Sequence, residues 1–221
     1  MTSWCSFALL ALLGLCAPVI STADVVYDTG TVSIGSTGRF GGSSVDSTQF
    51  LGVRFQAGGN FHASEIGGHF GGTPGSTIFG AIVHLSGPTD LPNLTDLTGD
   101  PDLLAVSVFG VPQASTVVWG LLSASIEDGE WYALVFGSGL FGASGDAYTP
   151  YEDVLVNTFA DSFSFSLSTG DVSQVTSTLG YFGLRGEALE VPEPMTALLL
   201  VLALVLLGLT QRNRTPPQAS K

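Results

Sequence analysis

Cysteine is almost missing from this 221-residue sequence. The only two, Cys5 and Cys16, both lie near its start, so the segment from 24 to 190 can form no disulfide. The same absence excludes a cysteine nucleophile from that segment. Its stability must therefore come from a hydrophobic core, and its 167 residues suffice for one domain that buries roughly 70% of its unfolded surface.

Basic residues are scarce as well. Between residues 24 and 190 there are three arginines (Arg39, Arg54 and Arg185), no lysine and eighteen acidic residues, which leaves a formal charge of −15. Such a surface repels nucleic acids and anionic lipids, so we expect no nucleic-acid partner. Cations and neutral glycans remain compatible with it, and solubility alone would also explain the charge.

Long amphipathic helices are the third absence, because no apolar stripe with helical spacing extends beyond two turns in this segment. Glycine instead makes up 27 of its 167 residues, roughly twice the usual 7%, and separates short apolar stretches. This pattern predicts an all-β chain. The expected strands are Val25–Tyr27, Phe50–Gln56, Phe61–Phe70, Thr77–Leu85, Leu103–Phe109, Thr116–Leu121, Trp131–Phe136, Val154–Thr158, Ser162–Leu167 and Gly180–Leu184.

Two of these strands, Trp131–Phe136 and the apolar part of Thr77–Leu85, are predicted to lie centrally and to be covered on both faces, since few polar residues interrupt them. Ser162–Leu167 alternates instead, which predicts Phe163, Phe165 and Leu167 facing a core. The economical packing is a single β-sandwich of jelly-roll type over residues 24–185, followed by a linker at 186–190.

The first 23 residues have the pattern of a secretory signal peptide. Phe7–Cys16 is an uninterrupted apolar core, and the small residues Ser21 and Ala23 favour cleavage after Ala23. The mature chain would then begin at Asp24 and contain no thiol. We expect export through the inner membrane.

The end of the chain carries a second hydrophobic segment, Met195–Thr210, which has no charged residue. As a helix it would be about 24 Å long, against about 30 Å of bilayer hydrocarbon, so it spans only with local thinning or snorkelling. Arg212 and Arg214 favour cytoplasmic retention of its end, which makes 215–221 a cytoplasmic tail. On these properties alone the segment is an ordinary single-span anchor.

Val191, Pro192, Glu193 and Pro194 precede this run, and Arg212 and Arg214 follow it. This order over residues 191–214 resembles the PEP-CTERM sorting signal of Gram-negative bacteria. The resemblance implies that a membrane-embedded exosortase reads Pro192, Glu193 and Pro194 and cuts near them. It also implies a transient membrane helix over 195–210 and a final location at the cell surface or in an extracellular exopolysaccharide matrix.

A second resemblance covers roughly residues 45 to 185. It is carried by four motifs in order, FLGVRF at 50–55, IGGHFGG at 66–72, FGAIV at 79–83 and WYALVFGSGLFGA at 131–143. These are similar to exported bacterial β-domains of the "choice-of-anchor" kind, which are joined to various C-terminal anchors. The resemblance implies a fold and a location but no activity.

The loop from Ser86 to Asp102 is the stretch with the clearest binding chemistry. It carries Asp90, Asp96, Asp100 and Asp102 and no basic residue, and oxygen-rich loops of this kind coordinate calcium. The spacing matches no EF-hand, and a plain insertion between strands is the alternative interpretation. We expect no other cofactor.

Histidine ligation of a metal is not expected. His62 and His69 are seven residues apart, so an unbroken strand would place them on opposite faces, and His84 lies among apolar residues as a core histidine would.

The segment Gly137–Gly142 matches a dinucleotide fingerprint, but Ala143–Pro150 cannot form the helix that this site needs, so we expect a tight turn. Glu127–Glu130 is likewise a turn signal before a strand.

No catalytic constellation is found, and no G-x-S-x-G elbow occurs. The leading hypothesis is a non-enzymatic exported protein of the cell surface or matrix. The alternative is a carbohydrate- or calcium-binding module, in which aromatic rings stack on sugars; a secreted hydrolase ranks last. The aromatic candidates are Trp119, Trp131, Tyr148 and Tyr151.

Overall fold

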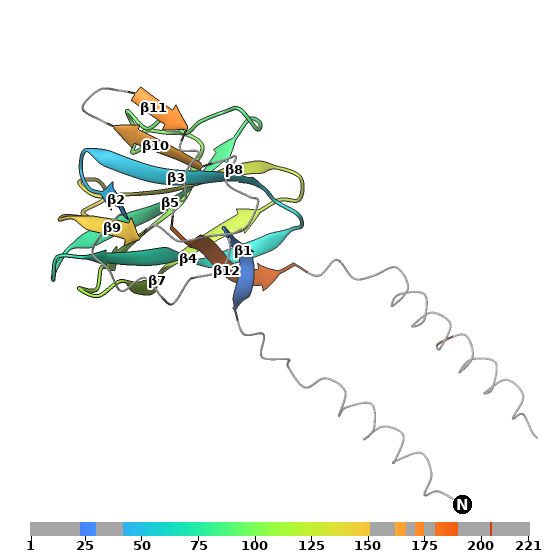
Figure 1. Cartoon of the computed structure of the whole chain (residues 1–221). Helices are drawn as coiled ribbons and strands as arrows, with labels where there is room; N and C mark the ends of the chain where they lie inside the picture. The colour runs from blue at the N-terminus through green and yellow to red at the C-terminus, as the bar shows by residue number, and fades with distance from the viewer. Residues whose placement is uncertain are drawn as a thin grey trace, which may run out of the picture. The chain divides into compact units, whose positions relative to one another are not determined.

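The structure is a computed structural model that describes residues 23–29, 42–150, 162–166, 171–174, 180–189 and 204 (Figure 1). By internal contacts the chain divides into two units, Met1–Glu187 and Ala188–Lys221. The strands are β1 (Asp24–Asp28), β2 (Gly42–Val45), β3 (Gln49–Gln56), β4 (Phe61–Gly72), β5 (Thr77–Leu85), β6 (Leu103–Gly110), β7 (Thr116–Ile126), β8 (Trp131–Gly137), β9 (Ala147–Pro150), β10 (Ser162–Ser166), β11 (Asp171–Gln174) and β12 (Phe182–Ala188).

The strands form two antiparallel sheets, which confirms the all-β prediction. Sheet 1 has the order β1-β12-β4-β9-β2, with β7 paired to β4 as well, and sheet 2 has the order β11-β10-β3-β8-β5-β6. Figure 1 shows β3, β5, β8 and β10 in one layer and β4, β7 and β12 in the other. The described part of 23–189 contains strands, turns and loops and no helix.

An aromatic cluster joins the two sheets. Phe70 and Phe182 of sheet 1 meet Phe136 of sheet 2, with ring centroids 5.2 Å and 4.8 Å from that of Phe136. All three side chains are fully buried. Burial of each large apolar side chain stabilises the fold by about 1.5–3 kcal/mol, so this cluster holds the sheets face to face.

The central strands of sheet 2 are buried on their outer face too. Phe79 and Ala81 of β5 belong to a second core, together with Leu94 and Leu97, which are 3% and 1% exposed. Both leucines come from the loop between β5 and β6, so this loop is a cover for the sheet. The predicted two-sided burial of the central strands β5 and β8 is therefore confirmed, and loops supply the cover on the outer side.

Strand positions agree with the sequence where the strands are apolar. β5 has the predicted bounds Thr77–Leu85, but β7 runs on to Ile126 and β12 starts later than predicted, at Phe182. Three short strands, β2, β9 and β11, were not predicted. Val154–Thr158 and Leu167 lie outside the described residues, as do the side chains of Phe163 and Phe165.

The first and last strands lie side by side. Asp24 at the start of β1 pairs with Gly186 of β12, and β12 continues to Ala188, into the range assigned above to a linker. The leader up to residue 22, the sorting signal apart from Leu204, and the tail 215–221 are outside the described residues. Among the residues that are described, no helix has the length and hydropathy needed to cross a membrane.

Candidate functional site

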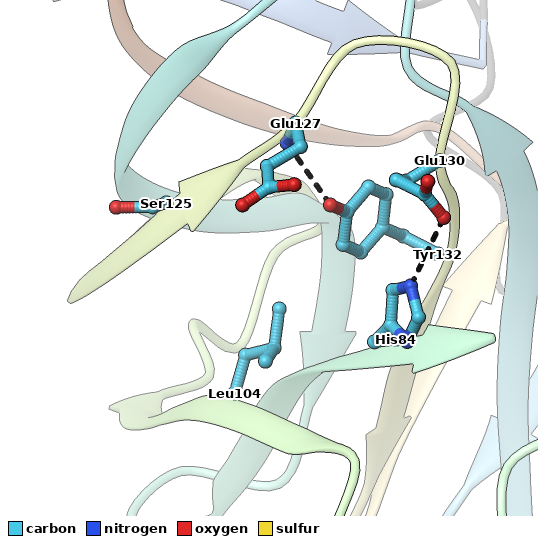
Figure 2. A pocket seen from close by; sticks show the side chains of 6 residues that line it. All are labelled: His84, Leu104, Ser125, Glu127, Glu130 and Tyr132. Carbon is cyan, nitrogen blue, oxygen red and sulfur yellow. Dashed lines mark hydrogen bonds and ion pairs between the residues drawn. The ribbon is translucent and has the colours of Figure 1, made fainter.

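A hollow of about 410 Å³ lies where β5, β6, β7 and β8 come together, and we call it the acidic pocket (Figure 2). Figure 2 shows the side chains of His84, Glu130 and Tyr132 close together and that of Ser125 pointing away from them. The lining residues are His84, Leu104, Ser125, Glu127, Glu130 and Tyr132.

Strand register brings the histidine of this pocket to its partner. His84 of β5 is directly opposite Tyr132 of β8, and their rings meet edge to face with centroids 5.5 Å apart. Glu130 directly precedes β8, and its Oε2 lies 3.3 Å from Nε2 of His84. The expectation of a core histidine is wrong, because His84 lies near the end of β5, where its side chain is 37% exposed.

Tyr132 closes the inner end of the pocket. Its Oη accepts a hydrogen bond of 2.9 Å from the backbone N–H of Glu127. Burial raises the pKa of the Tyr132 phenol above its ordinary value of 10.0, and the carboxylates of Glu127 and Glu130 act in the same direction. The phenol is therefore protonated at neutral pH, and its own proton remains available for donation.

The turn that carries both glutamates is anchored from the side. Gln56 Nε2 donates to the carbonyl of Gly129 at 2.8 Å, and the N–H of Asp128 donates to Asn60 Oδ1 at 3.0 Å. Ala57 adds two backbone hydrogen bonds, to Glu130 and from Gly129. Gly129 has a φ of 79°, a conformation that favours glycine. The predicted turn is confirmed, and its anchors fix one wall of the pocket.

The other two histidines lie on one face of β4, which corrects the prediction of opposite faces. Phe61 and Ala63, the two neighbours of His62 along β4, face the core, so His62 points away from it. Phe70, the neighbour of His69, also faces the core, so His69 points away from it too. The register with β7 shifts between Ala63 and Glu65, and this irregularity resets the alternation of side chains. His62 Nε2 lies 3.2 Å from Ser123 Oγ.

Three of the four calcium candidates, Asp90, Asp96 and Asp100, accept hydrogen bonds through their carboxylate oxygens within their own loop. Asp90 accepts hydrogen bonds from the hydroxyl of Ser86 at 2.7 Å and from its N–H at 2.9 Å, and these bonds lower the pKa of Asp90. Asp96 accepts from Gly99, and Asp100 accepts from Asn93 and Asp102. No group of three or more His, Cys, Asp or Glu side chains among the described residues is placed to hold a metal. Calcium binding by Asp90, Asp96, Asp100 and Asp102 stays a prediction.

The aromatic candidates are separated. Trp131 is half-buried and packs against the outer core of sheet 2. Trp119 and Tyr148 lie on the outer face of sheet 1, opposite Gly67 and Gly71 of β4. Tyr151 lies outside the described residues.

The glycine-rich segment after β8 is a tight turn, as predicted. Gly139 and Gly142 have φ values of 79° and 84°, and the N–H of Gly139 donates to the carbonyl of Ala143 at 3.0 Å. Two of its members, Leu140 and Phe141, pack on the outer core of sheet 2. This segment therefore serves packing, and no helix follows it to bind a pyrophosphate.

Of the residues assigned to sorting, only the expected cleavage position falls in the described part. Ala23 is exposed and directly precedes β1. Val191, Pro192, Glu193, Pro194, Arg212 and Arg214 lie outside it. In comparisons with known proteins, no family model matches the chain and no curated protein matches it.

Proposed function

We propose that this chain is a non-enzymatic exported protein, in which two terminal segments deliver a jelly-roll-type β-sandwich to the cell surface or an extracellular matrix. The observation that supports the proposal is the position of the first and last strands along the chain. β1 begins at Asp24, the residue after the expected cleavage position, and β12 ends at Ala188, three residues before Val191. Loss of both terminal segments would therefore remove no strand from either sheet.

The chemistry of the folded part suits this role. The two sheets pack without any cysteine, so folding after export requires no disulfide. The strongly acidic surface favours the solubility of a secreted domain. Under this proposal an exosortase-type membrane enzyme acts on Pro192, Glu193 and Pro194, the segment 195–210 holds the chain in the membrane only until then, and exopolysaccharide surrounds the released product.

Cell fractionation combined with mass spectrometry tests the proposal. We expect intact cells to carry mature protein that starts at Asp24, and deletion of 191–221 to change its distribution between membrane and medium. Glu193→Ala should slow tail processing, whereas Glu187→Ala, which removes an exposed carboxylate on β12, is the matched control. Full-length protein in the cytosol, or exported protein that still begins at Met1, would contradict the proposal.

A second candidate function is glycan binding on the outer face of sheet 1. Trp119 and Tyr148 lie over Gly67 and Gly71, which are four residues apart on β4, or about 13 Å along the strand. This separation is longer than one sugar unit, so the two rings would contact non-adjacent units of a glycan chain, and the Arg185 guanidinium already occupies one side of the Trp119 ring. Melting temperature measured across a panel of neutral glycans tests this function, because a ligand of the native state must stabilise it. Glycan-induced shifts that persist in Trp119→Ala and Tyr148→Ala would contradict it.

A further inference from the structure

The strands β6 and β7 form one side of the β-sandwich, and each lies at the edge of its sheet there. In the part of the chain that the structure describes, β6 pairs only with β5, and β7 pairs only with β4. The short connection 111–115 joins the two strands. A Cβ placed at Gly120 of β7 would meet the side chains of Ser107 and Phe109 of β6, so the two strands face each other across the sandwich. We call this side the β6–β7 edge.

The β6–β7 edge lacks the features that normally protect an edge strand, which are shortness, charged side chains and proline. The strands β6 and β7 have eight and eleven residues, LLAVSVFG and TVVWGLLSASI, with no charge and no proline. The other described edge strands, β1, β2 and β11, have only five, four and four residues. Asp24 and Asp28 lie at the two ends of β1, and Asp171 begins β11. The β6–β7 edge therefore differs from the others in being open to strand pairing.

Apolar side chains are exposed along the same edge. Of the four large hydrophobic side chains that are exposed on described strands, three belong to β6 and β7. They are Leu104, Val108 and Leu121, which are 43%, 41% and 77% exposed, and the fourth is Val25 of β1. An open backbone edge lined by apolar side chains is the surface to which another strand adds.

The two layers of this edge identify the kind of partner. β6 belongs to sheet 2 and β7 to sheet 1, so a single extended peptide would pair with only one of them. A second copy of the chain presents the same two edges in the same two layers, and a two-fold axis brings both pairs of edges together. Residues 24–190 carry a formal charge of −15 in each copy, which opposes the contact, but none of these charges lies on β6 or β7.

We propose that the β6–β7 edge is the interface of a symmetric dimer of this chain. Antiparallel pairing of β6 with β6 of the second copy continues sheet 2 from one subunit into the other, and β7 lies beside β7 in the second layer. The exposed side chains of Val108 and Leu121 are then covered by the same surface of the other subunit. Salt strengthens the dimer, because it screens the repulsion between two acidic subunits. The inference does not depend on export, and a cytosolic location for the chain would leave it intact.

Size-exclusion chromatography with light scattering tests the inference, using the purified full chain in detergent over a dilution series. We expect two copies per particle at high concentration, and a dissociation constant that falls as salt is raised. Val108→Glu places a carboxylate at the interface in both subunits, so it should raise the dissociation constant at least about tenfold. Val25→Glu is the matched control, because Val25 is 39% exposed on the edge strand β1 and its substitution adds the same charge. It should leave the dissociation constant nearly unchanged.

Hydrogen exchange of the natural chain tests the same contact without a substitution. We expect the backbone amides of β6 to exchange faster once dilution dissociates the dimer. A single copy per particle at every concentration, equal effects of Val108→Glu and Val25→Glu, or a dimer that survives Val108→Glu would each overturn the inference. Slow exchange of the β6 amides in a monomeric chain would overturn it too, because a segment of the same chain would then cover the edge.

Discussion

The guanidinium carbon of Arg185 lies 4.2 Å from the ring centroid of Trp119 on the outer face of sheet 1. Arg185 belongs to β12 and Trp119 to β7, and β4 runs between these two strands. The same guanidinium contacts Glu65 of β4 at 3.3 Å. One side chain therefore connects three strands of the sheet on the side away from the core.

Removal of this connection should lower stability. We expect Arg185→Ala to reduce the free energy of unfolding by about 1–2 kcal/mol, the sum of a partly desolvated cation–π contact and an ion pair. Arg185→Lys keeps the charge but loses the planar stacking, so it should recover only part of this loss. Urea denaturation measures both, and an Arg185→Ala variant as stable as the natural chain would show that the contact contributes nothing.

Gly67 is needed for the same arrangement. A Cβ at this position would collide with the backbone carbonyl of Val118 and would lie 2.8 Å from the Trp119 ring. Gly67→Ala should therefore destabilise the domain by about 1–3 kcal/mol, as overpacking does. Gly58→Ala is the control, because nothing lies within 4 Å of a Cβ there. Equal unfolding midpoints for the two variants would contradict this steric account.

The loop between β5 and β6 should behave as part of the core. We expect Leu97→Ala to cost about 2–5 kcal/mol, the range for a buried leucine. Leu121→Ala provides the comparison, because Leu121 is 77% exposed and its truncation should cost little. Thermal unfolding of both variants checks the difference. A Leu97→Ala variant with natural stability would mean that the loop is dispensable for the outer core.

Asp90 should make stability depend on pH in the acidic range. Hydrogen bonds from Ser86 lower the pKa of its carboxyl in the folded state below the ordinary value of 3.8. An unfolded chain then binds the proton more readily, so this contribution is present above pH 3.8 and is lost as pH falls through the folded-state pKa. Urea midpoints between pH 6 and pH 2.5 should fall less steeply in Asp90→Asn than in the natural chain. Parallel pH profiles would contradict the role of Asp90, and Glu187→Gln controls for the loss of one charge.

Hydrophobic pattern predicted the centre of the fold well and its edges poorly. β5 and β8 are apolar along almost their whole length, so their two-sided burial could be read from the sequence. β2 and β11 have the sequences GSSV and DVSQ, which carry almost no apolar signal. Their strands exist because neighbouring strands supply hydrogen-bond partners, and this is information that no local window contains.

The acidic pocket was missed for a related reason. His84 and Glu130 are 46 residues apart, and only the antiparallel register of β5 with β8 brings them together. The covering role of the loop after β5 had a weak signal in the sequence, because Leu91, Leu94 and Leu97 recur every third residue among its aspartates. The acidic residues drew attention to metal chemistry, whereas the leucines between them decide how the loop packs.

The pairing of Asp24 with Gly186 has a mechanical consequence. The backbone enters β1 and leaves β12 at the same corner of the folded unit, with the two strands about 5 Å apart. A tether attached to either end of the folded unit would therefore hold it at this one corner. Exchanging an N-terminal attachment for a C-terminal one would then leave the orientation of the unit unchanged, and the same far surface would point away from whatever holds it.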